Sequence, residues 1–270
     1  MEQVYLDVKR QRKNLLLGLV AAIAAVNAVV LLTVGSDIES HVGDLSRIGT
    51  IGSAVVMSFI VVARQKVSGL FGRAYLSLAI GLLLWLVAES IWAYYEIGLA
   101  IETPFPSIAD AVWIASYGPF AYHIFTTSKF FGKGVKKSSM IIVSIAAAMF
   151  LAFYIQAIVS VSELEGAEAL TSFAISIAYP VFDVMLIVPA VLMVTNAGRG
   201  QLTSIPWIFI GWILMATADS LLGITAVTNF TGEIFHITMT YNATYLFFLA
   251  GLIWYNKQFI VDDKQLANRM

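Results

Sequence analysis

Long apolar runs separated by short charged segments dominate this chain. A helix that crosses a bilayer needs about 20 mostly apolar residues, so each long run is a candidate span. Eight such runs occur, at residues 13–34, 47–63, 74–97, 108–129, 139–161, 171–196, 204–228 and 236–257. The pattern predicts an all-α, polytopic integral membrane protein with eight transmembrane helices, forming a single membrane domain over residues 1–270.

Composition supports a membrane protein. Of the 270 residues, 59% are hydrophobic and 12% are charged, whereas soluble domains have about 45–50% apolar and about 25% charged residues. The chain has no cysteine, which excludes a thiolate nucleophile, an iron–sulfur cluster and a cysteine zinc site. The first apolar run follows a basic segment, residues 9–13, and lacks a small-residue cleavage site. We therefore expect it to be an anchor, not a removed signal peptide.

Positive charges predict the orientation, because cytoplasmic loops of membrane proteins are enriched in lysine and arginine. With the N-terminus inside the cell, every one of the 16 lysines and arginines except Arg47 falls in a cytoplasmic segment. Acidic residues gather in the outer segments. We therefore expect a multi-pass protein of the cell membrane with both termini in the cytoplasm. Residues 258–270 would form a short cytoplasmic tail, without a soluble output domain.

An internal repeat is visible between the two halves of the chain. The sequence at 81–90, GLLLWLVAES, resembles GWILMATADS at 211–220, and the offset of 130 aligns Glu89 with Asp219. An offset of 128 aligns Tyr117 with Tyr245. We expect repeat one at about 13–129 and repeat two at about 139–257. Four helices per repeat would give both halves the same orientation, with a pseudo-twofold axis along the membrane normal.

Three carboxylates lie inside the predicted spans, at Glu89, Asp183 and Asp219. Each costs a few kcal/mol at the centre of a membrane helix, so such residues usually face the protein interior or water. No lysine or arginine lies in the interior of a predicted span. We therefore expect these groups to be protonated, hydrogen-bonded, or matched by a cation from outside.

Aromatic residues lie at helical spacing from these acids, which predicts an acidic and aromatic pocket open to the outer side. Pro180 would free a backbone carbonyl that could turn toward such a cavity. The simpler alternatives are that the acids only hold helices together and that Trp92 belongs to an interfacial aromatic belt, which we favour over a ligand cage. The candidate ligand-binding residues are Glu89, Asp110, Asp183, Asp219, Trp85, Trp92, Trp113, Tyr117, Tyr179 and Tyr245.

Several chemistries are disfavoured. A retinal Schiff base needs a lysine inside a span, and a haem between His123 and His236 would need histidines at similar depth. Phosphate loops and hydrolase motifs are missing, so we expect no enzyme activity, and the sequence assigns no metal or cofactor. The basic inner loop at 129–137 would contact anionic lipid or, as the less favoured alternative, a cytoplasmic signalling partner. We expect no nucleic-acid partner.

Four short motifs resemble a known class of membrane domain. They are WLVAESIWA at Trp85–Ala93, PSIADAVWIASY at Pro106–Tyr117, YPVFD at Tyr179–Asp183 and ADS at Ala218–Ser220. They are similar to the multi-pass sensory domains found N-terminal to bacterial diguanylate cyclases, cyclic-di-GMP phosphodiesterases and histidine kinases, here as a stand-alone chain. The resemblance implies a multi-pass sensory module. Together with the predicted pocket, it leads us to expect a receptor or sensor that binds a small ligand or cation on the outer side. A proton- or cation-coupled transporter or ion pathway is the main alternative, and a scaffold subunit of a membrane complex is the third.

Overall fold

A computed structural model describes residues 2–131, 135–161, 166–196, 206–227 and 235–260. These ranges form eight α-helices and contain no strand. A π-helical turn, η1 (Tyr94–Gly98), continues the third helix. The helices are α1 (Glu2–Thr33), α2 (Glu39–Gln65), α3 (Gly69–Ala93), α4 (Ile108–Phe131), α5 (Lys137–Val161), α6 (Ala167–Asn196), α7 (Pro206–Val227) and α8 (Phe235–Gln258). Most of the predicted tail lies outside the described residues.

Six of these helices are long and apolar enough to cross a membrane, namely α1, α2, α3, α5, α6 and α8. The predicted multi-pass helical membrane architecture is therefore confirmed, while a crossing by α4 and α7 stays a prediction. The described apolar stretch of α7 is short, Trp207–Gly223. Helix α4 contains polar side chains that lower its hydropathy, including Asp110, Ser116 and His123. These side chains are buried inside the protein.

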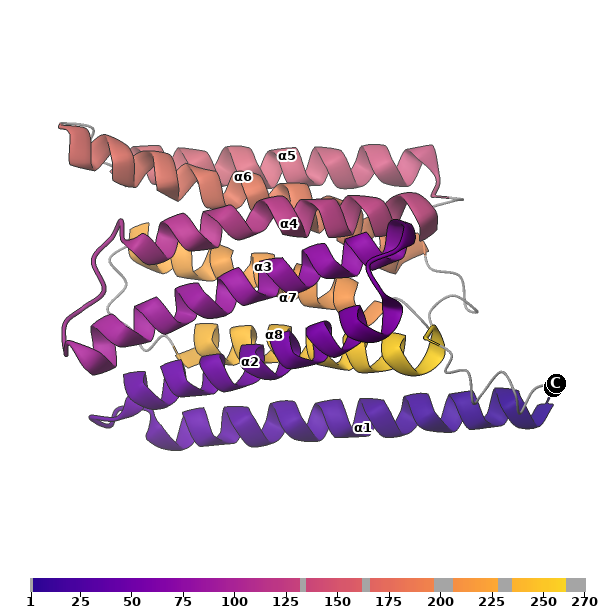
Figure 1. Cartoon of the computed structure of the whole chain (residues 1–270). Coiled ribbons are helices and arrows are strands. Elements are labelled where there is room, and N and C mark those ends of the chain that lie inside the picture. Colours follow the sequence, from indigo (N-terminus) through magenta and orange to yellow (C-terminus); the bar gives the residue numbers. More distant parts are fainter. Residues whose placement is uncertain (1, 132–134, 162–165, 197–205, 228–234, 261–270) are drawn as a thin grey trace.

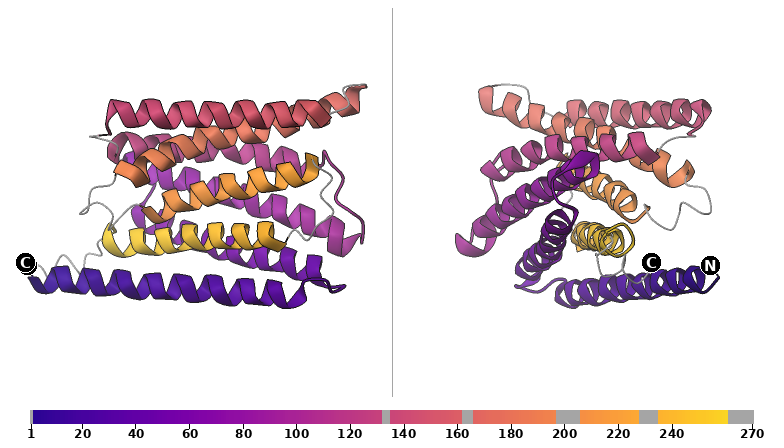
Figure 2. Two further views of the ribbon diagram at one scale, coloured as in Figure 1. Left: turned by 180° about the vertical axis from the view of Figure 1, so that it is seen from behind. Right: turned by 45° about the vertical axis from the view of Figure 1, so that its right-hand side comes forward.

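The eight helices lie side by side and alternate in direction, with α1 and α5 at opposite edges of the bundle (Figures 1 and 2). In the most apolar 18-residue stretch of each helix, 67% of the residues are buried in α8, but only 17% in α1 and 11% in α5. Large apolar side chains on the outside include Leu32, which is 85% exposed, and Phe153, which is 69% exposed. A bilayer suits such a surface, because in water it would be costly to expose.

Fully buried aromatic rings fill the centre of the bundle. The ring of Trp212 on α7 meets Phe120 of α4 edge-on at a centroid distance of 4.6 Å and Phe248 of α8 at 4.8 Å. Each phenylalanine also covers a glycine on the neighbouring helix. A Cβ atom at Gly81 would lie 2.3 Å from the Phe120 ring, and one at Gly211 would lie 2.7 Å from the Phe248 ring. Close packing of α3 on α4 and of α7 on α8 therefore depends on these glycines.

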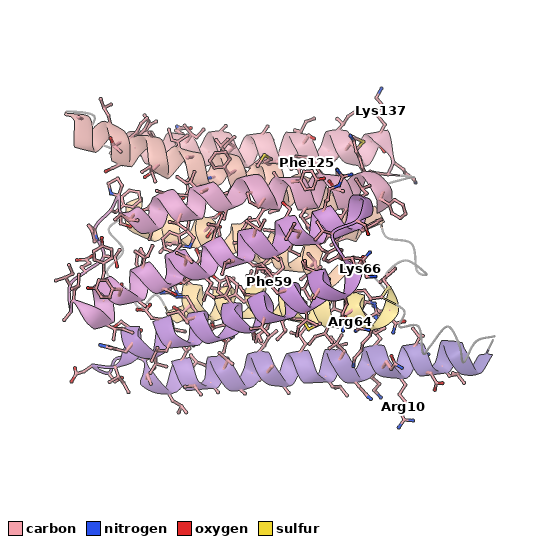
Figure 3. All side chains as sticks on the ribbon, viewed as in Figure 1. Arg10, Phe59, Arg64, Lys66, Phe125 and Lys137 are labelled. Atoms are coloured by element: carbon pink, nitrogen blue, oxygen red, sulfur yellow. The ribbon has the colours of Figure 1, made fainter. Side chains whose placement is uncertain are left out.

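The two ends of the bundle differ in charge. Figure 3 shows Arg10, Arg64, Lys66 and Lys137 at one end, which we call the basic end. The labelled Phe59 and Phe125 lie between the ends and are 40% and 47% exposed. The connections from α1 to α2 and from α3 to α4 lie at the opposite end, the acidic end, with Asp37, Glu39 and Glu102.

The start of α1 and the end of α8 lie together at the basic end. The Gln258 Nε2 atom donates to Gln11 Oε1 at 3.2 Å. An even number of crossings requires this arrangement. The side of the membrane that the basic end faces stays a prediction.

Buried polar side chains join α1, α2 and α8 near the acidic end. The Asn242 side chain donates to Ser46 Oγ at 2.9 Å and accepts from Thr50 Oγ1 at 3.1 Å. The Asn27 amide on α1 donates to the Met239 carbonyl at 3.3 Å. These bonds satisfy polar groups that would otherwise be costly inside a bilayer, and they fix α2 against α8 one turn from Arg47.

Candidate functional site

A cavity of about 590 Å³ extends into the bundle from the acidic end. Its wall includes Ser36 and Asp37 from the α1–α2 connection, Glu102 and Thr103 from the α3–α4 connection, and side chains from all eight helices. Of the ten candidate ligand-binding residues, the seven that line it are Trp85, Glu89, Trp92, Asp110, Trp113, Tyr179 and Asp219. The other three, Tyr117, Asp183 and Tyr245, lie behind the wall and contact carboxyl groups in it.

Glu89 is held at the inner wall of the cavity. Its Oε1 atom accepts a hydrogen bond from the Tyr245 hydroxyl at 2.7 Å, and that hydroxyl accepts from Trp85 Nε1 at 2.8 Å. Its Oε2 atom lies 3.2 Å from Arg47 Nε. Both carboxylate oxygens therefore have partners, on α8 and α2.

Arg47 corrects the expectation that no cation meets these acids. Helix α2 begins at Glu39, well before the apolar run, so Arg47 lies two turns inside the helix. Its side chain is 12% exposed and forms ion pairs with Asp44 and Glu89. The sequence signal was present, since Arg47 is the one cation assigned to the outer side. Its burial could not be predicted, because it depends on the packing of α2 against α3 and α8.

Asp219 and Asp183 form a second acidic group, between α7 and α6. Their carboxyl groups lie close together, because both meet the hydroxyl of Tyr117. The Tyr117 hydroxyl donates to Asp183 Oδ1 at 2.7 Å and lies 3.4 Å from Asp219 Oδ2, and the Tyr241 hydroxyl donates to Asp219 Oδ1. Within the described ranges, no lysine, arginine or histidine pairs with either aspartate. Two carboxyl groups in contact cannot both keep a negative charge cheaply, so a proton or a cation must neutralise one.

Asp110 has a clear structural role. Its Oδ2 atom accepts from the backbone N of Ser107 at 2.7 Å, and Ser107 Oγ accepts from the backbone N of Ala109 at 3.2 Å. This reciprocal pattern is a capping box at the start of α4. The remaining oxygen, Oδ1, accepts from the Tyr179 hydroxyl at 2.8 Å. Asp110 therefore lines the cavity with both oxygens already bonded.

Indole rings form an aromatic wall. Trp113 lies 6.1 Å from Trp85 and 5.7 Å from Trp92, centroid to centroid. Trp92 also lines the cavity, while the interfacial position that the sequence favours for it stays a prediction. Ser176, whose backbone carbonyl Pro180 cannot bond, also lines the cavity.

Lining residues outside the ten candidates include Asp44, Glu96, Tyr154 and Tyr241. Glu96 lies in the π-helical turn η1, and π-helical turns are frequent at functional sites. Tyr154 reaches in from α5, and its hydroxyl occupies the space beside Gly223, where a Cβ atom would lie 1.6 Å away. In the sequence, Gly223 follows Asp219 by four residues, and this glycine is only a weak indication that another side chain packs closely there.

Clustered metal ligands are not found among the residues that the structure describes. These residues contain no group of three or more histidine, aspartate or glutamate side chains placed to hold a metal ion. His123 is buried away from the cavity, with its Nδ1 atom 3.1 Å from the Ala74 carbonyl. This contact explains His123 as a packed, hydrogen-bonded side chain between α4 and α3.

Comparison with known proteins gives no relative, since no family model, no curated protein and no solved structure matches the chain.

Proposed function

We propose that the protein is a membrane receptor or sensor that binds a small cation or cationic ligand in the cavity at its acidic end. One observation supports this above the others. Glu89 and Asp219 are only 4% and 9% exposed, yet both line a cavity of about 590 Å³. Buried ionisable groups inside a membrane protein are expensive and usually mark a functional site.

Charge favours a cation over an anion. Among the described side chains that line the cavity, Arg47 is the single basic one, whereas the acidic ones are Asp37, Glu39, Asp44, Glu89, Glu96, Glu102, Asp110 and Asp219. A concentration of one sign of charge in a cleft attracts the opposite ion. The faces of Trp85, Trp92 and Trp113 add attraction for an organic cation. The volume suits a small molecule, since ligand pockets usually measure about 300–1,000 Å³.

Eight crossings and an internal repeat are part of this proposal. Two contacts support the repeat, because Gly81 meets Phe120 just as Gly211 meets Phe248, at the aligned positions. Helix pairing supports it too, since α2 packs on α8 and α6 packs on α4. The cavity wall includes residues of both halves, so a ligand would bind between them.

Signal output would be a population shift. Binding between the halves would favour one packing of the bundle over another, as far as the ligand prefers it. With the basic end in the cytoplasm, the change would reach the inner loops, which contact anionic lipid or a signalling partner. The resemblance to sensory membrane domains favours this use of the cavity.

A transporter or ion pathway is the second candidate. It is favoured by the Asp183–Asp219 contact, because carboxyl groups that exchange protons are common in proton-coupled carriers. Uptake of a labelled amine, or acidification, in vesicles containing the purified protein separates the two functions. A receptor gives no flux in this assay.

The double variant Glu89→Gln, Asp219→Asn tests the cavity directly. Without the two carboxylates, we expect alkylammonium ions to lose their ability to raise the melting temperature of the detergent-solubilised protein. The measurement is thermal unfolding across a series from methylammonium to 2-phenylethylammonium. Asp7→Asn, on the exposed start of α1, is the control and keeps the shift. The same shift in the double variant as in the wild type would contradict the assignment.

A further inference from the structure

The two membrane-embedded acids of the cavity occupy comparable positions with unlike partners. Glu89 accepts a hydrogen bond from Tyr245, which belongs to the other half of the chain. Asp219 lies 3.4 Å from the hydroxyl of Tyr117, again from the other half. The neighbour on the adjacent helix differs, because it is Arg47 on α2 beside Glu89 and Asp183 on α6 beside Asp219.

At Glu89 the protein supplies its own cation. The Arg47 guanidinium lies between Glu89 and Asp44, with its Nε atom 3.2 Å from Glu89 Oε2. A ligand cation there would have to displace a buried arginine from two carboxylates. Breaking such a pair leaves uncompensated buried charge, so this side of the cavity is already occupied.

At Asp219 the corresponding charge is missing. The described residues place two carboxyl groups and two tyrosine hydroxyls there, from Asp183, Asp219, Tyr117 and Tyr241, and no cation. The cavity reaches Asp219 and Tyr241 directly. One positive charge, or one proton, satisfies the pair.

We propose that the Asp219 side of the cavity binds a protonated amine, which replaces the proton shared by Asp183 and Asp219. This inference rests on the proposed function and specifies its ligand class and position. Charge balances, because one monovalent cation enters as one proton leaves to solvent. No covalent bond is made or broken in the ligand.

The chemistry of the wall favours an organic cation over a metal ion. The described residues contain no three-ligand metal group, and the volume of about 590 Å³ greatly exceeds that of a bare ion. Indole faces at Trp85, Trp92 and Trp113 suit an alkylammonium or arylalkylammonium group, whose attraction to aromatic rings strengthens when water is excluded.

Other titratable groups near Asp219 do not supply the proton at neutral pH. Apart from Asp183, they are Glu89 on α3, Tyr117 on α4, Tyr154 on α5, Tyr179 on α6, and Tyr241 and Tyr245 on α8. Phenols ordinarily ionise only near pH of about 10, and Glu89 is paired with Arg47. The exchangeable proton therefore belongs to the two aspartates.

The test compares 2-phenylethylammonium with uncharged 2-phenylethanol, which has nearly the same shape. Binding to the purified full chain is followed by tryptophan fluorescence and by melting temperature. We expect the ammonium ion alone to bind. Asp219→Asn should weaken its binding by about tenfold or more, in keeping with coupling energies of close charge pairs, whereas Glu89→Gln should change it by no more than about twofold.

Proton release gives a second readout. If one proton leaves for each cation bound, the association constant rises with pH by up to about tenfold per unit over the range in which the aspartates share a proton. Asp183→Asn removes the sharing partner while keeping a hydrogen-bond donor, so the pH dependence flattens. This variant and Asp219→Glu serve if Asp219→Asn does not fold.

The outcomes separate the inference from the proposed function. Loss of ammonium binding in Glu89→Gln, with binding retained in Asp219→Asn, would overturn the inference and leave a cation receptor. Binding with an unchanged pH dependence in Asp183→Asn would also overturn it. Failure of the whole ammonium series to bind the wild-type protein would overturn both.

Discussion

Arg47 shows how one side chain decides the chemistry of a cavity. Its guanidinium forms ion pairs with Glu89 and Asp44 on one side, while Asp219 has only a second carboxyl and hydroxyl groups as neighbours. A ligand therefore meets two acids of different availability. The sequence places both acids, but the difference between them arises from a residue on another helix.

Removing Arg47 alone should destabilise the protein. Arg47→Gln leaves Glu89 as a buried unpaired charge, and breaking such a pair costs about 3–5 kcal/mol. Adding Glu89→Gln removes that charge and should restore most of the lost stability, as thermal unfolding in detergent would measure. Arg73→Gln, at an exposed arginine, is the matched control. An Arg47→Gln protein as stable as the control would show that the ion pair is unimportant.

Helix packing depends on aligned glycine–phenylalanine contacts at the level of elements. Gly81 on α3 receives Phe120 of α4, and Gly211 on α7 receives Phe248 of α8. Trp212 contacts both phenylalanines. The helix pairs α3–α4 and α7–α8 therefore meet at Trp212. A change in the packing of either pair should alter the interface between the halves.

Alanine at either glycine should cost stability by similar amounts. A Cβ atom at Gly81 or Gly211 would overlap a buried ring, and overpacking of this kind costs about 1–3 kcal/mol. Gly49→Ala on α2 is the control, because nothing lies within 4 Å of its Cβ position. Unfolding midpoints in detergent measure the effect. Unchanged midpoints for Gly81→Ala and Gly211→Ala would argue against close packing of these helix pairs.

Hydropathy predicted where helices lie better than where they begin. Helix α2 starts at Glu39 rather than residue 47. Its early turns include the polar residues Asp44, Ser46 and Arg47, which interact with each other and with α3 and α8. Helical spacing predicted a shared pocket for acids and indole rings, and Glu89, Trp85 and Trp92 line one cavity. The contribution of Tyr154 depends on the rotation and tilt of α5 against its neighbours, which a one-dimensional pattern does not contain.

Over the whole molecule, charge separates the two ends. The cavity opens at the end with Asp37, Glu39 and Glu102, and the labelled basic side chains lie at the other. Because α4 and α7 lie among the six candidate spans (Figure 1), we expect all eight helices to cross the bilayer. With eight crossings, we expect the basic end to face the cytoplasm.

Single cysteines test this topology cleanly, because the chain has none of its own. Glu102→Cys and Lys137→Cys flank α4, and Thr195→Cys and His236→Cys flank α7. We expect an impermeant maleimide applied to intact cells to label positions 102 and 236, and to label 137 and 195 only after permeabilisation. The cysteine-free parent shows the background. Labelling of both members of a pair from the same side would mean that the helix between them does not cross.

Hydroxyl groups cross between the halves of this bundle. Tyr245 bonds to Glu89, Tyr117 bonds to Asp183, and Tyr179 bonds to Asp110, so each half completes acids that belong to the other. A half inserted alone would hold its carboxyl groups without these donors, at a cost that falls only when the second half arrives. The same bonds that shape the cavity therefore also stabilise the correct assembly of the two halves.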